Sequence, residues 1–373
     1  MMKAQTKRTL YRVFLLVCGL AVVVGTVLIA CNAIEPARAG ATGYYWAFGI
    51  AIAFLVLLPV NTIVHEAGHL VFGYLAGMKF SSIRFARFRL LRVGKKVRGR
   101  FLRGKEVAGS CEMYPGSAKN VRGRMIFYAL GGAVFNLVYG AAFVVTCFLC
   151  PMHPVLYFFQ LFAPLCLLDA ATSLYPAETA TGKTDGEMIR GLAAREPSSV
   201  VALHVLTVQG MLNTGSFSDI DEKFLFDLPV VREDDPAFLA ITQLRWEYLF
   251  SKGDEAGALK QLFRLESLYD YLPEINRSDV ACELLYAYSV LAPDLLKAEC
   301  YLTDAAEANG TCAYYRAMAA YTLAKGEPHD HFLDEAKRIL PQEPIRGISE
   351  LEQKFIGKLD GKCAESVSAG QAD

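Results

Sequence analysis

Two histidines and a glutamate have a spacing that suits metal-assisted hydrolysis. The pentapeptide His65-Glu66-Ala67-Gly68-His69 places the histidines at positions i and i+4, which share one face of a helix. Their imidazole nitrogens can therefore bind one Zn²⁺, and zinc lowers the pKa of a bound water to about 7. Glu66 lies beside them, placed to act as general base on that water. The pattern predicts a hydrolytic zinc site.

The motif lies in an apolar stretch, where ionisable side chains are costly and indicate function. Residues 44–78 are long enough to cross a bilayer, which needs about 20 mostly apolar residues in a helix. A short amphipathic helix carrying a structural histidine pair is the alternative. Three further stretches are long enough to cross a bilayer, at residues 9–34, 125–150 and 155–175.

The charges are unevenly distributed, although the 373-residue chain has a net charge of zero. Residues 1–124 hold 19 Lys and Arg against four Asp and Glu. Fourteen of these basic residues lie at 79–124, and cytoplasmic loops carry such an excess. We therefore expect a multi-pass protein of a bacterial cell membrane, with both termini and this loop in the cytoplasm. A cleaved signal ending near residues 28–31 is the alternative for the first stretch.

Two segments resemble the site-2 protease family of intramembrane zinc metalloproteases. The stretch HEAGHLVFGYLAGMKF is similar to that family's first core helix, which ends at a small residue, here Gly77, before a strand. The segment from Gly132 to Asn136 has the spacing of the family's GP-x-x-N pattern, with Ala133 in place of proline. The resemblance implies that Asn136 contacts the substrate backbone or the reaction centre. A hydrogen bond between helices is the alternative.

A third, weaker resemblance concerns the remaining zinc ligand. Family members have an N-x-x-P segment followed by Asp-Gly, and here Ser173-Leu-Tyr-Pro176 precedes Asp185-Gly186 after a longer insert. The resemblance implies Asp185 as third ligand. Asp169, inside the fourth apolar stretch, is the rival, and Glu178 is a lesser one. Two histidines, one carboxylate and an open water position are typical of a catalytic zinc site.

The basic loop alternates apolar and positively charged side chains over residues 79–105. This pattern predicts short strands at the cytoplasmic membrane surface, with a hairpin turn at residues 93–97. The family resemblance suggests that such strands pair with an extended substrate. The positive charge also suits anionic lipid headgroups, at about 1 kcal/mol per residue. A nucleic-acid partner is not expected beside membrane spans.

The second half of the chain has a different pattern. Apolar residues recur every three or four positions, with no run long enough to span a bilayer. Helix pairs are expected to begin near Ala237, Arg277 and Cys312, a spacing that resembles tetratricopeptide-type repeats. Such repeats form a groove for a regulatory protein partner. An irregular helical domain without a groove is the alternative.

Together these features predict a mainly α fold in three parts. Residues 1–43 form an N-terminal transmembrane anchor and a short external loop. Residues 44–190 form a membrane-embedded zinc protease core, giving a bundle of about four spans with a strand insert. Residues 191–373 form a cytoplasmic helical-repeat domain. The expected function is zinc-dependent cleavage of a membrane-protein substrate near the cytoplasmic face. The alternative is a non-catalytic membrane scaffold that uses its helical domain for protein assembly.

Overall fold

The structure is a computed structural model. It describes residues 2–34, 42–85, 87–93, 96–101, 109–149, 162–179, 182–272, 274–343 and 345–370. The chain is mainly helical and contains a small antiparallel sheet, which confirms the predicted fold class at that level. It divides into two compact units. Unit 1 comprises residues 1–92 and 97–196, and unit 2 contains residues 197–373.

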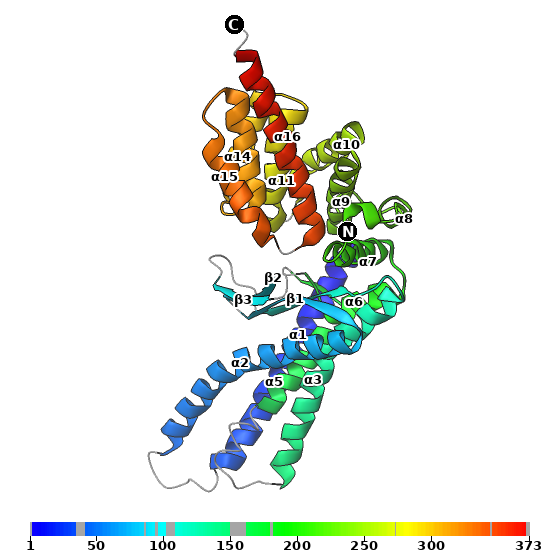
Figure 1. Ribbon diagram of the computed structural model, residues 1–373. Coiled ribbons are helices and arrows are strands. Elements are labelled where there is room, and N and C mark those ends of the chain that lie inside the picture. Colours follow the sequence, from blue (N-terminus) through cyan, green and yellow to red (C-terminus); the bar gives the residue numbers. More distant parts are fainter. Residues whose placement is uncertain are drawn as a thin grey trace. The chain divides into compact units, whose positions relative to one another are not determined.

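Apolar helices dominate unit 1 (Figure 1). They are α1 (Met2–Ile34), α2 (Thr42–Leu75), α3 (Val121–Leu149) and α5 (Phe162–Leu174). Within the described part of the chain, one helix is long and apolar enough to cross a membrane, over Val121–Thr146 of α3. The apolar segments Thr9–Gly25 and Phe162–Leu174 are shorter. The bundle of about four spans therefore stays a prediction.

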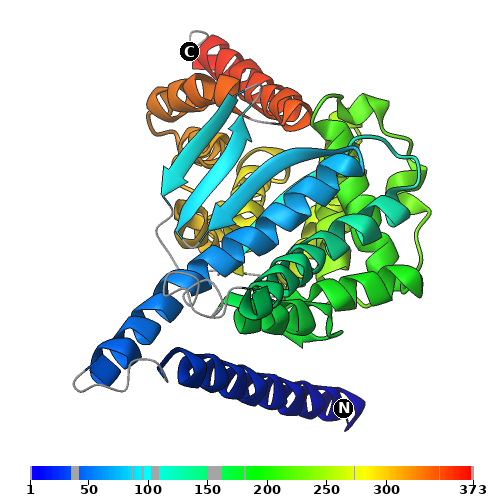
Figure 2. The ribbon, with the colours of Figure 1, turned by 90° about the horizontal axis from the view of Figure 1, so that it is seen from below.

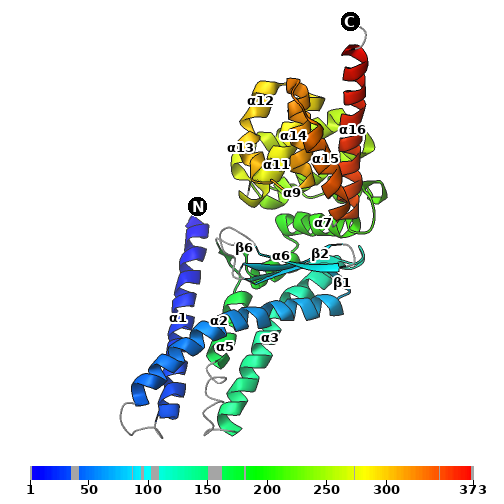
Figure 3. The same ribbon diagram turned by 60° about the vertical axis from the view of Figure 1, so that its left-hand side comes forward.

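Glycines allow α2 and α3 to cross with their backbones in contact. A Cβ atom on Gly68 would lie 2.3 Å from the carbonyl oxygen of Gly131, and one on Gly131 would lie 2.4 Å from that of Gly68. Phe72 and Phe127 stack beside the crossing, with ring centroids 4.7 Å apart. Helix α2 contains Pro59, which removes a helical hydrogen bond, and the helix bends along its length (Figures 1 and 3). At this crossing, the turn of α2 that carries the histidines packs against α3.

A four-stranded sheet follows α2 directly. Gly77 ends the helix in the left-handed region, at φ +72°, and its N–H donates to the carbonyl of Tyr74. The described strands lie in the order β3-β2-β1-β4, side by side in Figure 2, so β4 has a free edge among them. The strands expected in the basic loop are present, while residues 94–95 of the expected turn lie outside the described residues. Their bounds are β1 (Met78–Phe85), β2 (Phe88–Val93), β3 (Lys96–Phe101) and β4 (Gly109–Pro115).

Among the described residues from 197 onward, unit 2 consists of helices and the loops that join them. Helices α9 and α14 end at Gly253 and Gly326, and both glycines adopt positive φ, at +84° and +71°. The tetratricopeptide-like groove stays a prediction. The α-helices are α7 (Pro197–Leu212), α8 (Lys223–Phe226), α9 (Pro236–Lys252), α10 (Glu255–Glu266), α11 (Glu274–Tyr286), α12 (Leu295–Cys300), α13 (Leu302–Ala306), α14 (Cys312–Lys325), α15 (Asp330–Ile339) and α16 (Arg346–Gly370).

A buried ion network joins three helices of unit 2. Arg316 of α14 is fully buried, and its Nη2 donates to Oε1 of Glu283 on α11 over 2.6 Å. Its Nε donates to Oε2 of Glu352 on α16 over 2.7 Å. The guanidinium also lies 4.1 Å from the ring centroid of Phe355 and 4.8 Å from that of Tyr286. One cation therefore balances two buried carboxylates at the centre of this core.

Glu247 of α9 makes the stability of unit 2 depend on pH. Its Oε2 atom is buried and has no hydrogen-bonding partner among the described residues. Burial, with the negative charge of Glu283, raises the pKa of Glu247 to about 8. The folded state therefore keeps a proton that the unfolded state releases. The contribution of Glu247 to the free energy of unfolding should be largest below about pH 4.5. It should fall as pH rises to about 8, by at most ~1.4 kcal/mol per pH unit.

The test is chemical denaturation of the full chain across this pH range, followed by the fluorescence of Trp246. Trp46→Phe removes the other tryptophan. Glu247→Gln should flatten the pH dependence, because the neutral amide has no proton to lose. Glu350→Gln, a change on an exposed ion pair of α16, should keep the slope. An equal slope in Glu247→Gln and the unmodified chain contradicts the prediction.

Candidate metal centre

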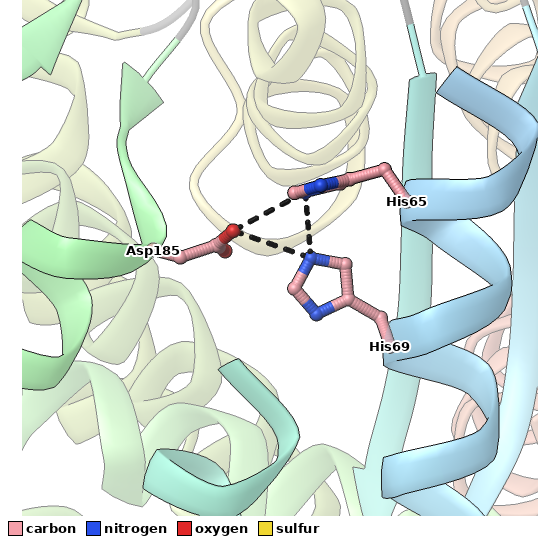
Figure 4. Close-up of side chains that lie close together, drawn as sticks. All are labelled: His65, His69 and Asp185. Atoms are coloured by element: carbon pink, nitrogen blue, oxygen red, sulfur yellow. Dashed lines mark hydrogen bonds and ion pairs between the residues drawn. The ribbon is translucent and has the colours of Figure 1, made fainter. Parts of the chain in front are cut away.

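Helix α2 and the start of α6 (Asp185–Ala193) bring three potential ligands together (Figure 4). The Nε2 atoms of His65 and His69 are 3.1 Å apart. The Oδ2 atom of Asp185 lies 3.3 Å from Nε2 of His65 and 3.4 Å from Nε2 of His69. Tetrahedral zinc ligands at about 2.0–2.1 Å from the ion lie about 3.3–3.4 Å from one another. This group could therefore hold a metal ion, and its spacing fits zinc.

His69 is oriented by the backbone of α3. Its Nδ1 atom lies 3.0 Å from the carbonyl oxygen of Tyr128, which can only accept a hydrogen bond. Nδ1 therefore carries the proton, and the lone pair of Nε2 faces the other two ligands. The hydroxyl of Tyr128 donates to the carbonyl of Cys111 in β4. One tyrosine thus holds both a candidate metal ligand and a strand of the sheet.

The turn before α6 fixes Asp185 in place. Thr184 is the N-cap of α6, and its hydroxyl donates to the carbonyl oxygen of Tyr175 over 2.7 Å. A Cβ atom on Gly186 would lie 1.9 Å from the carbonyl oxygen of Leu174, so only glycine lets α6 pack this closely on the end of α5. The Asp-Gly pair therefore has a structural reason: the glycine lets the helix start where the aspartate reaches the histidines.

The Asp185 carboxyl group is held in its charged form. Burial opposes its ionisation, but hydrogen bonds with His65, His69 and Ser173 outweigh burial and hold the pKa of Asp185 well below its usual range. The hydroxyl of Ser173 donates to Oδ2 of Asp185 over 2.6 Å. The residue that stands where the site-2 protease pattern has asparagine thus supports the candidate ligand oxygen.

A cavity of about 390 Å³ lies beside the three candidate ligands, and Glu66 is on its wall. Gly109 of β4 passes beside it, since a Cβ atom on Gly109 would lie 2.9 Å from Oε1 of Glu66. Gly132 of α3 lies over the histidines, and a Cβ atom there would lie 2.5 Å from Nε2 of His65. The cavity therefore combines the candidate metal ligands, a carboxyl group and one end of the edge strand.

The rival carboxylates lie elsewhere. Asp169 faces the opposite nitrogen of His65, with its Oδ2 atom 3.7 Å from Nδ1, and it accepts a hydrogen bond of 2.7 Å from Asn136. Asn136 is fully buried, and its Nδ2 atom both donates to Asp169 on another helix and lies 3.1 Å from Nδ1 of the candidate ligand His65. Glu178, exposed in the small hairpin of β5 (Glu178–Thr179) and β6 (Gly182–Lys183), is not part of the ligand group.

Sequence reasoning missed two residues of this site. Asn61 donates to Asp169, although nothing singled it out in the sequence. A signal was available, because Asn61 precedes His65 by the same interval that separates His65 from His69, in an otherwise apolar stretch. Ser173 was seen only as a departure from a family pattern, and its hydrogen bond depends on the fold of the insert before Asp185.

Comparison with known proteins gives no relative. No protein-family model, no curated protein and no solved structure matches the chain.

Proposed function

We propose that the protein is an intramembrane zinc metalloendopeptidase that cleaves a membrane-protein substrate near the cytoplasmic face of a bacterial membrane. The observation that carries the proposal is the triangle of His65, His69 and Asp185 with Glu66 in the same cavity. Three protein ligands leave a fourth position for water or substrate, as in catalytic zinc sites. The motifs shared with the site-2 protease family favour the same activity.

Each residue has a defined task in this mechanism. When bound, Zn²⁺ would supply an activated water and polarise the scissile carbonyl. His65, His69 and Asp185 would hold the ion, and the Tyr128 carbonyl fixes the tautomer of His69. Glu66 accepts a proton from the attacking water at its carboxylate and returns it to the leaving amine.

The membrane setting is part of the proposal. Helices α1, α2 and α5 would join α3 in a bundle of about four spans, with both termini in the cytoplasm. Supporting this, α1 exposes large apolar side chains such as Leu16, 72% exposed, and Leu20, 61% exposed. Such surfaces are costly in water and are matched by lipid. The basic strands would then lie near anionic headgroups.

The substrate of this proposal is an extended segment of a membrane protein. A helical segment hides its carbonyl groups, whereas an extended one can add to a free sheet edge. Strand β4 offers such an edge among the described strands, and Gly109 brings one end of it to Glu66. A regulatory protein bound by the helices of unit 2 would select or time the substrate. No nucleic-acid partner is proposed.

Glu66→Gln should abolish peptide cleavage while zinc remains bound. The amide keeps the shape of the side chain but cannot accept the proton of the attacking water. The measurement compares membrane-protein fragments in cells that express the unmodified protein, Glu66→Gln or the exposed-site control Glu350→Gln, with zinc content determined on each purified protein.

Three results decide between the candidate functions. Fragments that are lost only in Glu66→Gln, with zinc retained, support the peptidase. Identical fragments in all three proteins, with zinc bound, contradict the peptidase and favour the non-catalytic scaffold. Absence of zinc from the unmodified protein contradicts the metal site itself.

A further inference from the structure

Asp169 of α5 accepts two amide hydrogen bonds on a single carboxylate oxygen. Asn61 of α2 donates to Oδ2 over 2.8 Å, and Asn136 of α3 donates to the same atom over 2.7 Å. Both asparagines are buried, Asn61 to 6% exposure and Asn136 completely. Polar side chains in apolar helices are costly unless they are paired and used. The two amides therefore fix the carboxylate in one position, and that position faces His65.

His65 needs a hydrogen-bond acceptor at that side. To offer the lone pair of Nε2 to a metal, the ring must carry its proton on Nδ1, and this N–H is normally directed at an acceptor. Two side-chain atoms near Nδ1 are Nδ2 of Asn136, at 3.1 Å, and Oδ2 of Asp169, at 3.7 Å. The amide nitrogen of Asn136 is a donor, whereas the carboxylate can accept.

Turning the Asn136 amide over does not remove the need for Asp169. The amide oxygen would then lie where Nδ2 now lies, 2.7 Å from Oδ2 of Asp169. Two oxygens that can only accept hydrogen bonds would then face each other at that distance and repel one another. With both asparagines donating, the Asp169 carboxylate is the acceptor group beside Nδ1, at an ion-pair distance of 3.7 Å that a small turn of the imidazole would shorten to a hydrogen bond.

We propose that Asp169 is the positioning carboxylate of His65, and that Asn61 and Asn136 hold it in place. The inference rests on the metal site proposed above and gives its two histidines different supports. His69 donates to a neutral backbone carbonyl, while His65 faces a negative charge. A carboxylate behind a ligating imidazole fixes the ring and makes it the more basic ligand. Asp169 thus strengthens metal binding without touching the metal.

Asp169→Asn should weaken zinc binding by about 10- to 100-fold while the site still takes up one ion, since such supporting partners contribute that much. The measurement is competition between the purified full-length protein and a zinc chelator. The Co²⁺-loaded protein should keep the intense absorption of a four-coordinate site, with its bands shifted, because the ligand set is unchanged. Asp185→Asn, which changes a ligand, should lose that absorption.

A matched control is Thr146→Val in α3. The Thr146 hydroxyl donates only to the Phe143 carbonyl of its own helix, so its loss removes a polar group from an apolar helix far from the ligands in sequence. Its zinc affinity should equal that of the unmodified protein. As a single change, Asn61→Ala should weaken zinc binding. Added to Asp169→Asn, it should weaken zinc binding little further, because Asn61 acts through that carboxylate.

Two results would overturn the inference. Unchanged zinc affinity in both Asp169→Asn and Asn61→Ala would show that the carboxylate does not support His65. Loss of the four-coordinate Co²⁺ absorption in Asp169→Asn, with retention in Asp185→Asn, would make Asp169 a ligand. Because these readouts do not involve peptide cleavage, a protein that binds zinc as described but cleaves nothing would contradict the proposed function alone.

Discussion

Gly132→Ala is expected to empty the metal site and to end any activity that depends on it. The added methyl group would lie 2.5 Å from Nε2 of His65 and 2.6 Å from Nε2 of His69. Favourable contacts between such atoms require about 3.5–4.0 Å. His69 cannot move away freely, since its Nδ1 atom is hydrogen-bonded to the carbonyl of Tyr128. The histidines must therefore turn aside, and the ligand triangle opens.

The backbone of α3 cannot absorb the extra methyl group either. The neighbouring Gly131 already contacts the backbone of α2 at Gly68, so a shift of α3 away from the histidines would have to break the helix crossing. The measurement is the zinc content of the purified protein. Gly19→Ala, where a new Cβ atom meets nothing within 4 Å, should keep its zinc. Full zinc occupancy in Gly132→Ala would contradict the close approach of Gly132 to the two histidines.

Arg316→Met should cause the largest loss of stability in unit 2. Methionine fills much of the same volume but leaves Glu283 and Glu352 buried without their shared cation. Removing one partner of a buried ion pair costs about 3–5 kcal/mol, because the remaining charge is uncompensated. The free energy of unfolding, followed by the fluorescence of Trp246 in a Trp46→Phe background, measures the effect.

Two comparisons separate charge from packing. The loss in Arg316→Met should be smaller in acid, because protonation neutralises the carboxylates left behind. Adding Glu283→Leu and Glu352→Leu should recover much of the stability, since an apolar replacement of a whole buried ion network is often neutral or stabilising. Arg338→Met, in an exposed pair with Glu335, should change stability by less than about 0.5 kcal/mol. A similar loss in Arg338→Met and Arg316→Met would contradict the role of burial.

The sequence predicts the elements of this protein better than their contacts. Hydropathy locates the long helices of unit 1, and the interval from His65 to His69 puts both on one face of α2. Asp185 came from a motif, not from periodicity. The role of Gly132 could not be derived in this way, because it depends on which helix crosses α2 and at which turn. A residue pattern identifies the buried face of a helix but does not show which other helix packs against that face.

The same limit applies to the carboxylates. Asp169 and Asp185 were both candidate ligands in the sequence, and their different positions around His65 arise only when α5 and α6 are placed. In unit 2, α9, α11 and α14 begin close to the positions expected from the sequence, Ala237, Arg277 and Cys312. The pairing of Arg316 with acids from two other helices could not be expected, since its partners lie 33 and 36 positions away.

Tyr128 gives the site a mechanical property. Its backbone oxygen holds the ring of His69, and its hydroxyl holds the Cys111 carbonyl on the edge strand. A displacement of β4 therefore acts on the same residue whose backbone carbonyl orients a candidate metal ligand. Under the proposed function, a peptide paired with β4 and an ion bound by His69 would both act on Tyr128, so the two binding events would be coupled, and that coupling would be reciprocal.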